Sequence, residues 1–119
     1  MRLFDALNAG DIDATMGLLT KDIHILGANG SHVDGADAAR AYYTGLIAGH
    51  LALTPYGNAI VNGDRVILTY GLAVDTLRNL GIPSGETTGR FYIRNGKIAA
   101  IDAKYSPMTQ AAISAATSR

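Results

Sequence analysis

The chain has 119 residues, of which 48% are hydrophobic and 17% charged, so it is long and apolar enough to fold around a core. Its 10 basic and 10 acidic residues cancel, which argues against a nucleic-acid-binding surface, and the absence of cysteine excludes disulfides and thiolate chemistry. No apolar run approaches the roughly 20 residues of a membrane span, and the N-terminus lacks a signal-peptide layout. We expect a single soluble, cytoplasmic domain over residues 1–119.

The first half of the chain has the pattern of helices separated by glycines and helix caps. Leu3, Phe4 and Leu7 form one apolar stripe. Gly10 is expected to end this helix, and Asp11 is a favourable N-cap for the next one. The predicted helices cover residues 2–9, 12–19, 36–48 and 108–116, and a short strand covers residues 23–26.

After residue 51, β-prone segments alternate with turn signals such as Asn62-Gly63 and Asn95-Gly96. The longest segment, residues 64–78, is apolar on both faces, which indicates a strand that is covered on both sides. Because helices come first and an antiparallel meander follows, the predicted fold class is α+β. The predicted strands cover residues 56–61, 66–77, 87–93 and 97–105.

The two faces of the long segment lead to two further expectations. One face carries small residues such as Gly71 and ends at Asp75, and we expect it to line the interior. The other face carries Leu68, Tyr70 and Leu72, which would form an exposed apolar patch on a monomer. The sequence therefore predicts a homodimer that buries this outer face of the sheet.

The Asn95-Gly96 turn is compatible with two strand registers. A two-residue type I′ turn pairs Arg94 with Lys97, whereas a type I turn followed by a G1 bulge pairs Ile93 with Lys97. The bulged register gathers apolar residues on one face and charged residues on the other. We therefore expect the bulge, with Asp102 exposed and the alanine that follows it inside.

Several short motifs resemble the SnoaL-like or NTF2-like superfamily. They are the segment from Phe4 to Asp11, Asp22, Gly35 before a helix, and Asn95-Gly96-Lys97-Ile98. The resemblance covers nearly the whole chain. It implies a cone in which a strongly bent antiparallel sheet wraps against N-terminal helices and encloses a deep apolar cavity.

Within the superfamily, the segment Val74 to Arg78 is most similar to the limonene-epoxide hydrolases. These enzymes hold a water with a Tyr and an Asn, and complete the site with an Arg-x-Asp pair and a second Asp. Asp75 matches the first Asp. The other positions differ, because the chain has Ile25 for the Tyr, Gly27 for the Asn, Ala73 for the Arg and Ala103 for the second Asp.

Asp75 is the predicted catalytic residue, a general acid or base whose pKa would be raised by burial in the cavity. The alternative is a carboxylate at a strand end that faces solvent or caps the next turn. His24, His32 and His50 do not cluster by spacing, so we expect neither a metal nor a cofactor. The residues expected to line the cavity and contact the ligand are Ile25, Gly27, Tyr43, Leu77, Thr87, Phe91, Ile101 and Tyr105.

Three functions stay open at this point. The first is an isomerase or cyclase, or less favourably a limonene-epoxide-hydrolase-like hydrolase, that acts on a small apolar molecule. The second is a module that binds such a molecule without converting it. The third is a dimerisation domain whose cavity is filled by side chains.

Overall fold

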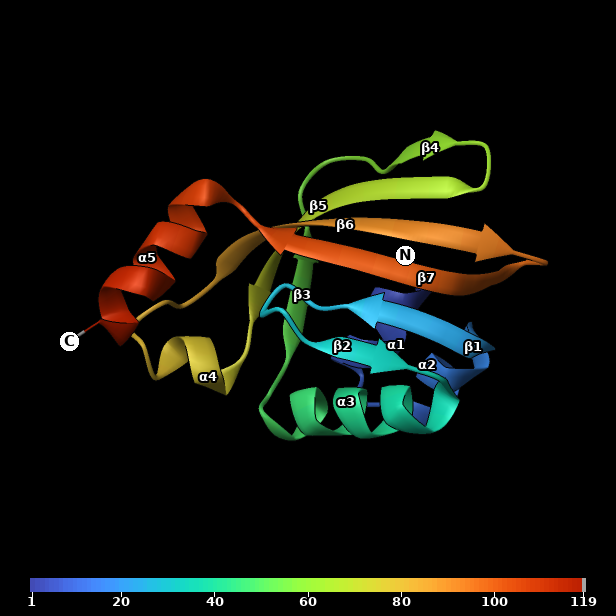
Figure 1. Cartoon of the computed structure of the whole chain (residues 1–119), viewed down its shortest axis with the longest axis horizontal. Coiled ribbons are helices and arrows are strands. Elements are labelled where there is room, and N and C mark those ends of the chain that lie inside the picture. Colours follow the sequence, from blue (N-terminus) through green and yellow to red (C-terminus); the bar gives the residue numbers. More distant parts are fainter. Residues whose placement is uncertain (119) are drawn as a thin grey trace.

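The computed structural model describes residues 1–118 as helices packed on a bent seven-stranded sheet (Figure 1). Its strand order is β2-β1-β7-β6-β5-β3, with β4 paired to β5, and only β1 and β7 run parallel. The helices are α1 (Arg2–Asn8), α2 (Ile12–Gly17), α3 (Ala36–Ala48), α4 (Asp75–Arg78) and α5 (Pro107–Thr117). The strands are β1 (Leu19–Leu26), β2 (His32–Asp34), β3 (Ala52–Pro55), β4 (Ile60–Asn62), β5 (Arg65–Ala73), β6 (Gly85–Arg94) and β7 (Lys97–Tyr105).

This arrangement confirms the α+β class. The N-terminal helices cover part of the sheet, whereas α4 and α5 lie beyond one end of it (Figure 1). The predicted Asp11 cap is present, because its side chain accepts a hydrogen bond from the Ala14 amide, and Ser106 caps α5 in the same way by accepting one from the Thr109 amide. Among residues 1–118, no helix combines the length and apolarity that crossing a membrane requires.

The first four strands, β1 to β4, differ from the prediction. β1 begins at Leu19, inside the expected second helix, and β2 forms within what was expected to be a loop. The strand predicted at residues 56–61 is largely absent, because β3 ends before it at Pro55 and β4 begins only at Ile60; both pair with β5. Edge strands this short carry little hydrophobic periodicity, so pairing with a longer neighbour decides where they form.

The long strand is shorter than predicted. β5 ends at Ala73, and Val74 becomes the N-cap of the short helix α4. The Asp75 amide donates to the Gly49 carbonyl oxygen at 2.8 Å, which ties the start of α4 to the end of α3. Asp75 therefore belongs to a helical turn. The prediction that it faces the interior assumed instead that it continued the strand.

The two faces of β5 are also reversed relative to the prediction. Leu68 and Tyr70 are only 4% and 5% exposed, and the Tyr70 ring packs edge-on against Phe4 of α1 with centroids 4.7 Å apart. A strand that is apolar on both faces does not itself show which face is covered. The large side chains point inward, so the apolar patch on which the homodimer was predicted is buried within one chain.

The β6–β7 hairpin combines parts of the two predicted registers. Asn95 and Gly96 have φ angles of 53° and 77°, and Arg94 pairs with Lys97, as in a type I′ turn. The register then shifts by one residue, because Ala99 has no partner on β6. The predicted turn is therefore wrong, but the sidedness beyond the bulge is right: Ala103 is buried inside, whereas Asp102 is half-buried on the outer face.

Candidate functional site

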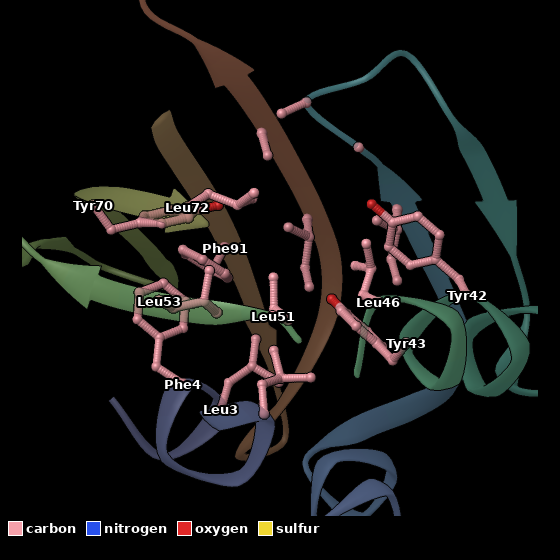
Figure 2. A pocket seen from close by; sticks show the side chains of 16 residues that line it. Leu3, Phe4, Tyr42, Tyr43, Leu46, Leu51, Leu53, Tyr70, Leu72 and Phe91 are labelled. Carbon is pink, nitrogen blue, oxygen red and sulfur yellow. The ribbon is translucent and has the colours of Figure 1, made fainter. Parts of the chain in front are cut away.

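An apolar cavity lies between the inner face of the sheet, α1 and α3 (Figure 2). Its volume is about 50 Å³, on a scale on which one water molecule needs roughly 10–15 Å³. It therefore admits only a very small organic molecule. It is lined by Leu3, Phe4, Leu7, Ile25, Gly27, Ala28, Tyr42, Tyr43, Leu46, Leu51, Leu53, Tyr70, Leu72, Phe91, Ile101 and Ala103.

Helix α1 closes one side of the cavity. Its stripe of Leu3, Phe4 and Leu7 is 2–3% exposed. Asn8, one residue further on, fixes the helix to β3: its Nδ2 donates to the Leu53 carbonyl oxygen at 2.9 Å, and its Oδ1 accepts from the Leu53 amide at 2.7 Å. This paired hydrogen bond holds the wall of the cavity against the sheet edge.

Three tyrosines supply most of the polar groups of the cavity. Tyr42 and Tyr43 come from α3 and Tyr70 from β5, and their hydroxyls point into the space between helix and sheet (Figure 2). Within residues 1–118, none of these hydroxyls forms a hydrogen bond with another protein group. None of the three hydroxyl oxygens is completely buried. The hydroxyls are thus free to bind a polar atom inside the cavity.

Burial determines the charge state of these tyrosines. It raises the pKa of Tyr43 and of Tyr70 far above the usual value near 10, and it also raises the pKa of Tyr42. Near neutral pH all three are therefore protonated and can donate a hydrogen bond. Because none of the lining residues carries a charged side chain, the cavity offers neutral donors and no built-in base.

Aromatic side chains take up the space that two glycines, Gly27 and Gly89, leave beside the cavity. A β-carbon at Gly89 would lie 2.8 Å from the Phe91 ring and 3.0 Å from the Tyr70 ring. A β-carbon at Gly27 would lie 2.6 Å from the Tyr42 hydroxyl. These glycines let the aromatic rings approach the backbone, which explains why the cavity is small.

Asp75 lies outside the cavity, contrary to the prediction. Its side chain is 44% exposed and joins α3 to α4: Oδ2 is 2.8 Å from His50 Nδ1, and Oδ1 accepts from Arg78 Nη1 at 3.0 Å. Arg78 Nη2 also donates to the His50 carbonyl oxygen. The hydrogen bond with His50 and the Arg78 guanidinium hold the pKa of Asp75 below its usual value, so the expected upward shift is wrong.

The structure divides the other predicted ligand contacts among three places. Ile25, Gly27, Tyr43, Phe91 and Ile101 line the cavity together. Leu77 and Tyr105 line a separate open cleft beside α4 and α5. Thr87 is fully buried, its hydroxyl donates to the Gly85 carbonyl oxygen, and it lines neither space.

Several lining residues were missed by sequence reasoning. Tyr70 was assigned to the wrong face of β5, and Tyr42 was not among the residues expected to line the cavity. Leu51 and Leu53 alternate directly after the Gly49 helix stop, which is a signal for an inward-facing strand that could have been used.

Comparison with known proteins identifies the family to which this fold belongs. Residues 1–101 match the SnoaL-like domain family. The chain belongs to the SnoaL-like family. No curated protein sequence matches it significantly. The resemblance expected from the sequence motifs is therefore confirmed at the level of the family, and the closer resemblance to limonene-epoxide hydrolases stays a prediction.

Solved structures share the fold of this SnoaL-like chain at low sequence identity. One is SalBIII, described as an epoxide hydrolase/cyclase-like enzyme in pyran ring formation in salinomycin, with a TM-score of 0.76, 19% identity and coverage of 90% of this chain and 87% of that one. Another is a candidate SnoaL-like polyketide cyclase from Jannaschia sp. CCS1, with a TM-score of 0.74, 22% identity and coverage of 99% and 88%. A third is an NTF2-like protein from Cytophaga hutchinsonii ATCC 33406, with a TM-score of 0.74, 15% identity and coverage of 90% and 86%.

Proposed function

We propose that this SnoaL-like protein binds a small, mostly apolar, neutral molecule and holds one of its oxygen atoms with the cavity tyrosines. The observation that carries the proposal is the set of three protonated hydroxyls that face an apolar space without protein partners. A carbonyl, epoxide or ether oxygen would supply the missing acceptor. The uncharged lining favours a neutral ligand, because burying an unpaired charge is costly.

Isomerisation or cyclisation is the reaction that this site supports best. Both reactions conserve the atoms of the substrate, and both build negative charge on an oxygen that a hydroxyl donor can stabilise. Because no carboxylate or imidazole lines the cavity, solvent must accept and return the proton in isomerisation, whereas hydrolysis would in addition need a water positioned for attack. Asp75 has no part in this proposal, since it lies in the contact between α3 and α4.

Binding is tested with cyclopentanone and, as an apolar control of similar shape, methylcyclopentane. In amide-resolved NMR titrations, we expect cyclopentanone to shift the signals of Ile25, Gly27 and Ala103. The affinity for the ketone should exceed that for the hydrocarbon by about 2–12-fold, the worth of one net hydrogen bond. Equal affinities, or shifts confined to surface residues, would contradict a tyrosine-held oxygen.

Catalysis is tested separately through exchange of the α-protons of cyclopentanone in D2O, with solvent as the base. Hydroxyl donors that stabilise the enolate oxygen should accelerate exchange, and Tyr43→Phe or Tyr70→Phe should reduce the acceleration. An exchange rate equal to that in buffer would contradict the isomerase proposal and show that the protein only binds the ketone.

We also propose that two copies pair through the outer face of the sheet. The residues that support this proposal differ from the patch predicted from the sequence. Ile60 of β4 is 63% exposed and pairs with the half-buried Ile67 of β5, so an apolar strip remains on that face. Light scattering at micromolar concentration should show a dimer that Ile67→Lys dissociates. A monomeric wild-type protein would contradict this proposal.

A further inference from the structure

A second, larger space lies next to the cavity. It is an open cleft of about 470 Å³ that is lined by residues of the loop after β1 and of the region of α4 and α5. Figure 1 shows these two helices beyond the end of the sheet. This volume lies within the range of about 300–1,000 Å³ that is typical of small-molecule sites. The inner cavity, at about 50 Å³, is far below that range.

The cleft and the cavity adjoin each other. Ala28, in the loop that follows β1, lines both spaces. Tyr105 lines the cleft and is not among the residues that line the cavity. A molecule held by the cavity tyrosines would therefore extend past Ala28 into the cleft.

The walls of the cleft are fixed to the body of the protein. At the base of α5, the Glu86 amide donates to Thr109 Oγ1 at 3.1 Å and the Ser106 amide donates to the Glu86 carbonyl oxygen at 2.8 Å. On the other side, α4 is held by the contacts of Asp75 and Arg78 with His50, just after α3. These contacts make the cleft a built feature and not a gap between loose segments.

The lining of the cleft indicates what it would hold. Leu77, Leu80 and Ile113 supply an apolar surface. Asn29, Thr76 and Gln110 supply amides and a hydroxyl that can donate and accept hydrogen bonds. As in the cavity, none of the lining residues carries a charged side chain. The cleft thus suits a neutral, mostly apolar chain or ring that carries hydroxyl or carbonyl groups.

We propose that the cleft is a second subsite, which binds the distal part of an elongated neutral ligand whose oxygen-bearing end enters the cavity. The inference rests on the proposed function and narrows its substrate class. Substrates of this class are neutral ketones, epoxides or polyols that are longer than the cavity. Molecules that carry a carboxylate or phosphate in the part that occupies the cleft are excluded.

The test compares three probes in amide-resolved NMR titrations: 2-butanone, 2-octanone and octanoate at pH 7.5. We expect 2-butanone to shift only cavity signals such as those of Gly27 and Ala103. In contrast, 2-octanone should also shift Gly30, Gln110 and Ile113 of the cleft and bind more tightly. Octanoate, which has the same chain length, should bind at least tenfold more weakly than 2-octanone.

A pair of variants on α5 localises the effect. Ile113→Trp narrows the cleft and should weaken 2-octanone binding about tenfold without changing the affinity for 2-butanone. Ala112→Trp, at an exposed neighbouring position that does not line the cleft, should change neither affinity. The subsite is refuted if 2-octanone shifts no cleft signal, if octanoate binds equally well or if Ile113→Trp has no effect. Failure of 2-butanone to bind the cavity would instead refute the proposed function.

Discussion

The Tyr42 hydroxyl lies 2.6 Å from the point where a β-carbon at residue 27 would stand, so this hydroxyl occupies the space that Gly27 leaves. Gly27→Ala should therefore push the Tyr42 side chain aside and weaken cyclopentanone binding several-fold. The cost in stability should be small, because the displaced atom is the end of a flexible side chain. Calorimetric titration and thermal unfolding measure the two effects.

Gly45→Ala is the matched control for that substitution. Gly45 lies in α3 with nothing within 4 Å of its would-be β-carbon. Alanine is a better helix former, so this variant should be more stable by about 0.5–1 kcal/mol and bind cyclopentanone like the wild type. Equal ligand affinity in both glycine variants would contradict the role given to Tyr42.

Tyr43→Phe and Tyr70→Phe remove hydroxyls that lack protein partners among the described residues. Each variant should therefore keep the stability of the wild type or gain slightly, whereas cyclopentanone binding should fall about 2–12-fold. The affinity for methylcyclopentane should not change. A loss of more than about 2 kcal/mol of stability in either variant would show that its hydroxyl is structural.

Asp75→Asn should affect pH-dependent stability and not the cavity. The pKa of Asp75 is lowered in the folded state, so the group stabilises the fold above its unfolded pKa near 4, and this contribution is lost as the pH falls through the folded pKa. The variant should be less stable than the wild type at pH 7, and the difference should shrink towards pH 3. Urea unfolding over this range measures it, with the exposed Asp64→Asn as control.

The same variant, Asp75→Asn, distinguishes a catalytic role of Asp75 from a structural one. Cyclopentanone binding and α-proton exchange should both be unchanged in Asp75→Asn, because the carboxylate does not line the cavity. Loss of exchange with unchanged binding would restore Asp75 as a catalytic residue.

Asn8→Ala should detach α1 from β3. The substitution leaves the Leu53 amide and carbonyl without their partner, which costs about 1–3 kcal/mol for a buried group. Chemical unfolding should show this loss, and hydrogen exchange at the Leu53 amide should become faster. Asn58→Ala, at an exposed position outside the helices and strands, should show neither change.

The parts of the fold that depend on neighbouring residues could be predicted from the sequence, whereas the parts that depend on distant pairing could not. Asp11 caps its helix as predicted, and α3 spans the predicted residues, because caps and periodicity act over a few residues. The edge strands could not be placed, since their positions depend on pairing with β5.

The candidate site was predicted only in part, for a related reason. Ile25, Phe91 and Ile101 line the cavity as expected, because each lies on a strand whose buried face is clear from alternation. The faces of β5 are both apolar, so alternation could not show that Tyr70 is inside. Asp75 was misplaced because the tertiary hydrogen bond from its amide to Gly49 ends the strand before it.

The central claim, that tyrosine hydroxyls hold the oxygen of a neutral ligand inside the cavity, is tested most directly by the ¹³C signal of the bound carbonyl. Cyclopentanone labelled at the carbonyl carbon should show a downfield shift on binding to the wild-type protein, as expected for a hydrogen-bonded carbonyl. The shift should be lost in the Tyr43→Phe/Tyr70→Phe double variant. A bound carbonyl with no downfield shift, or with the same shift in the double variant, would contradict the claim.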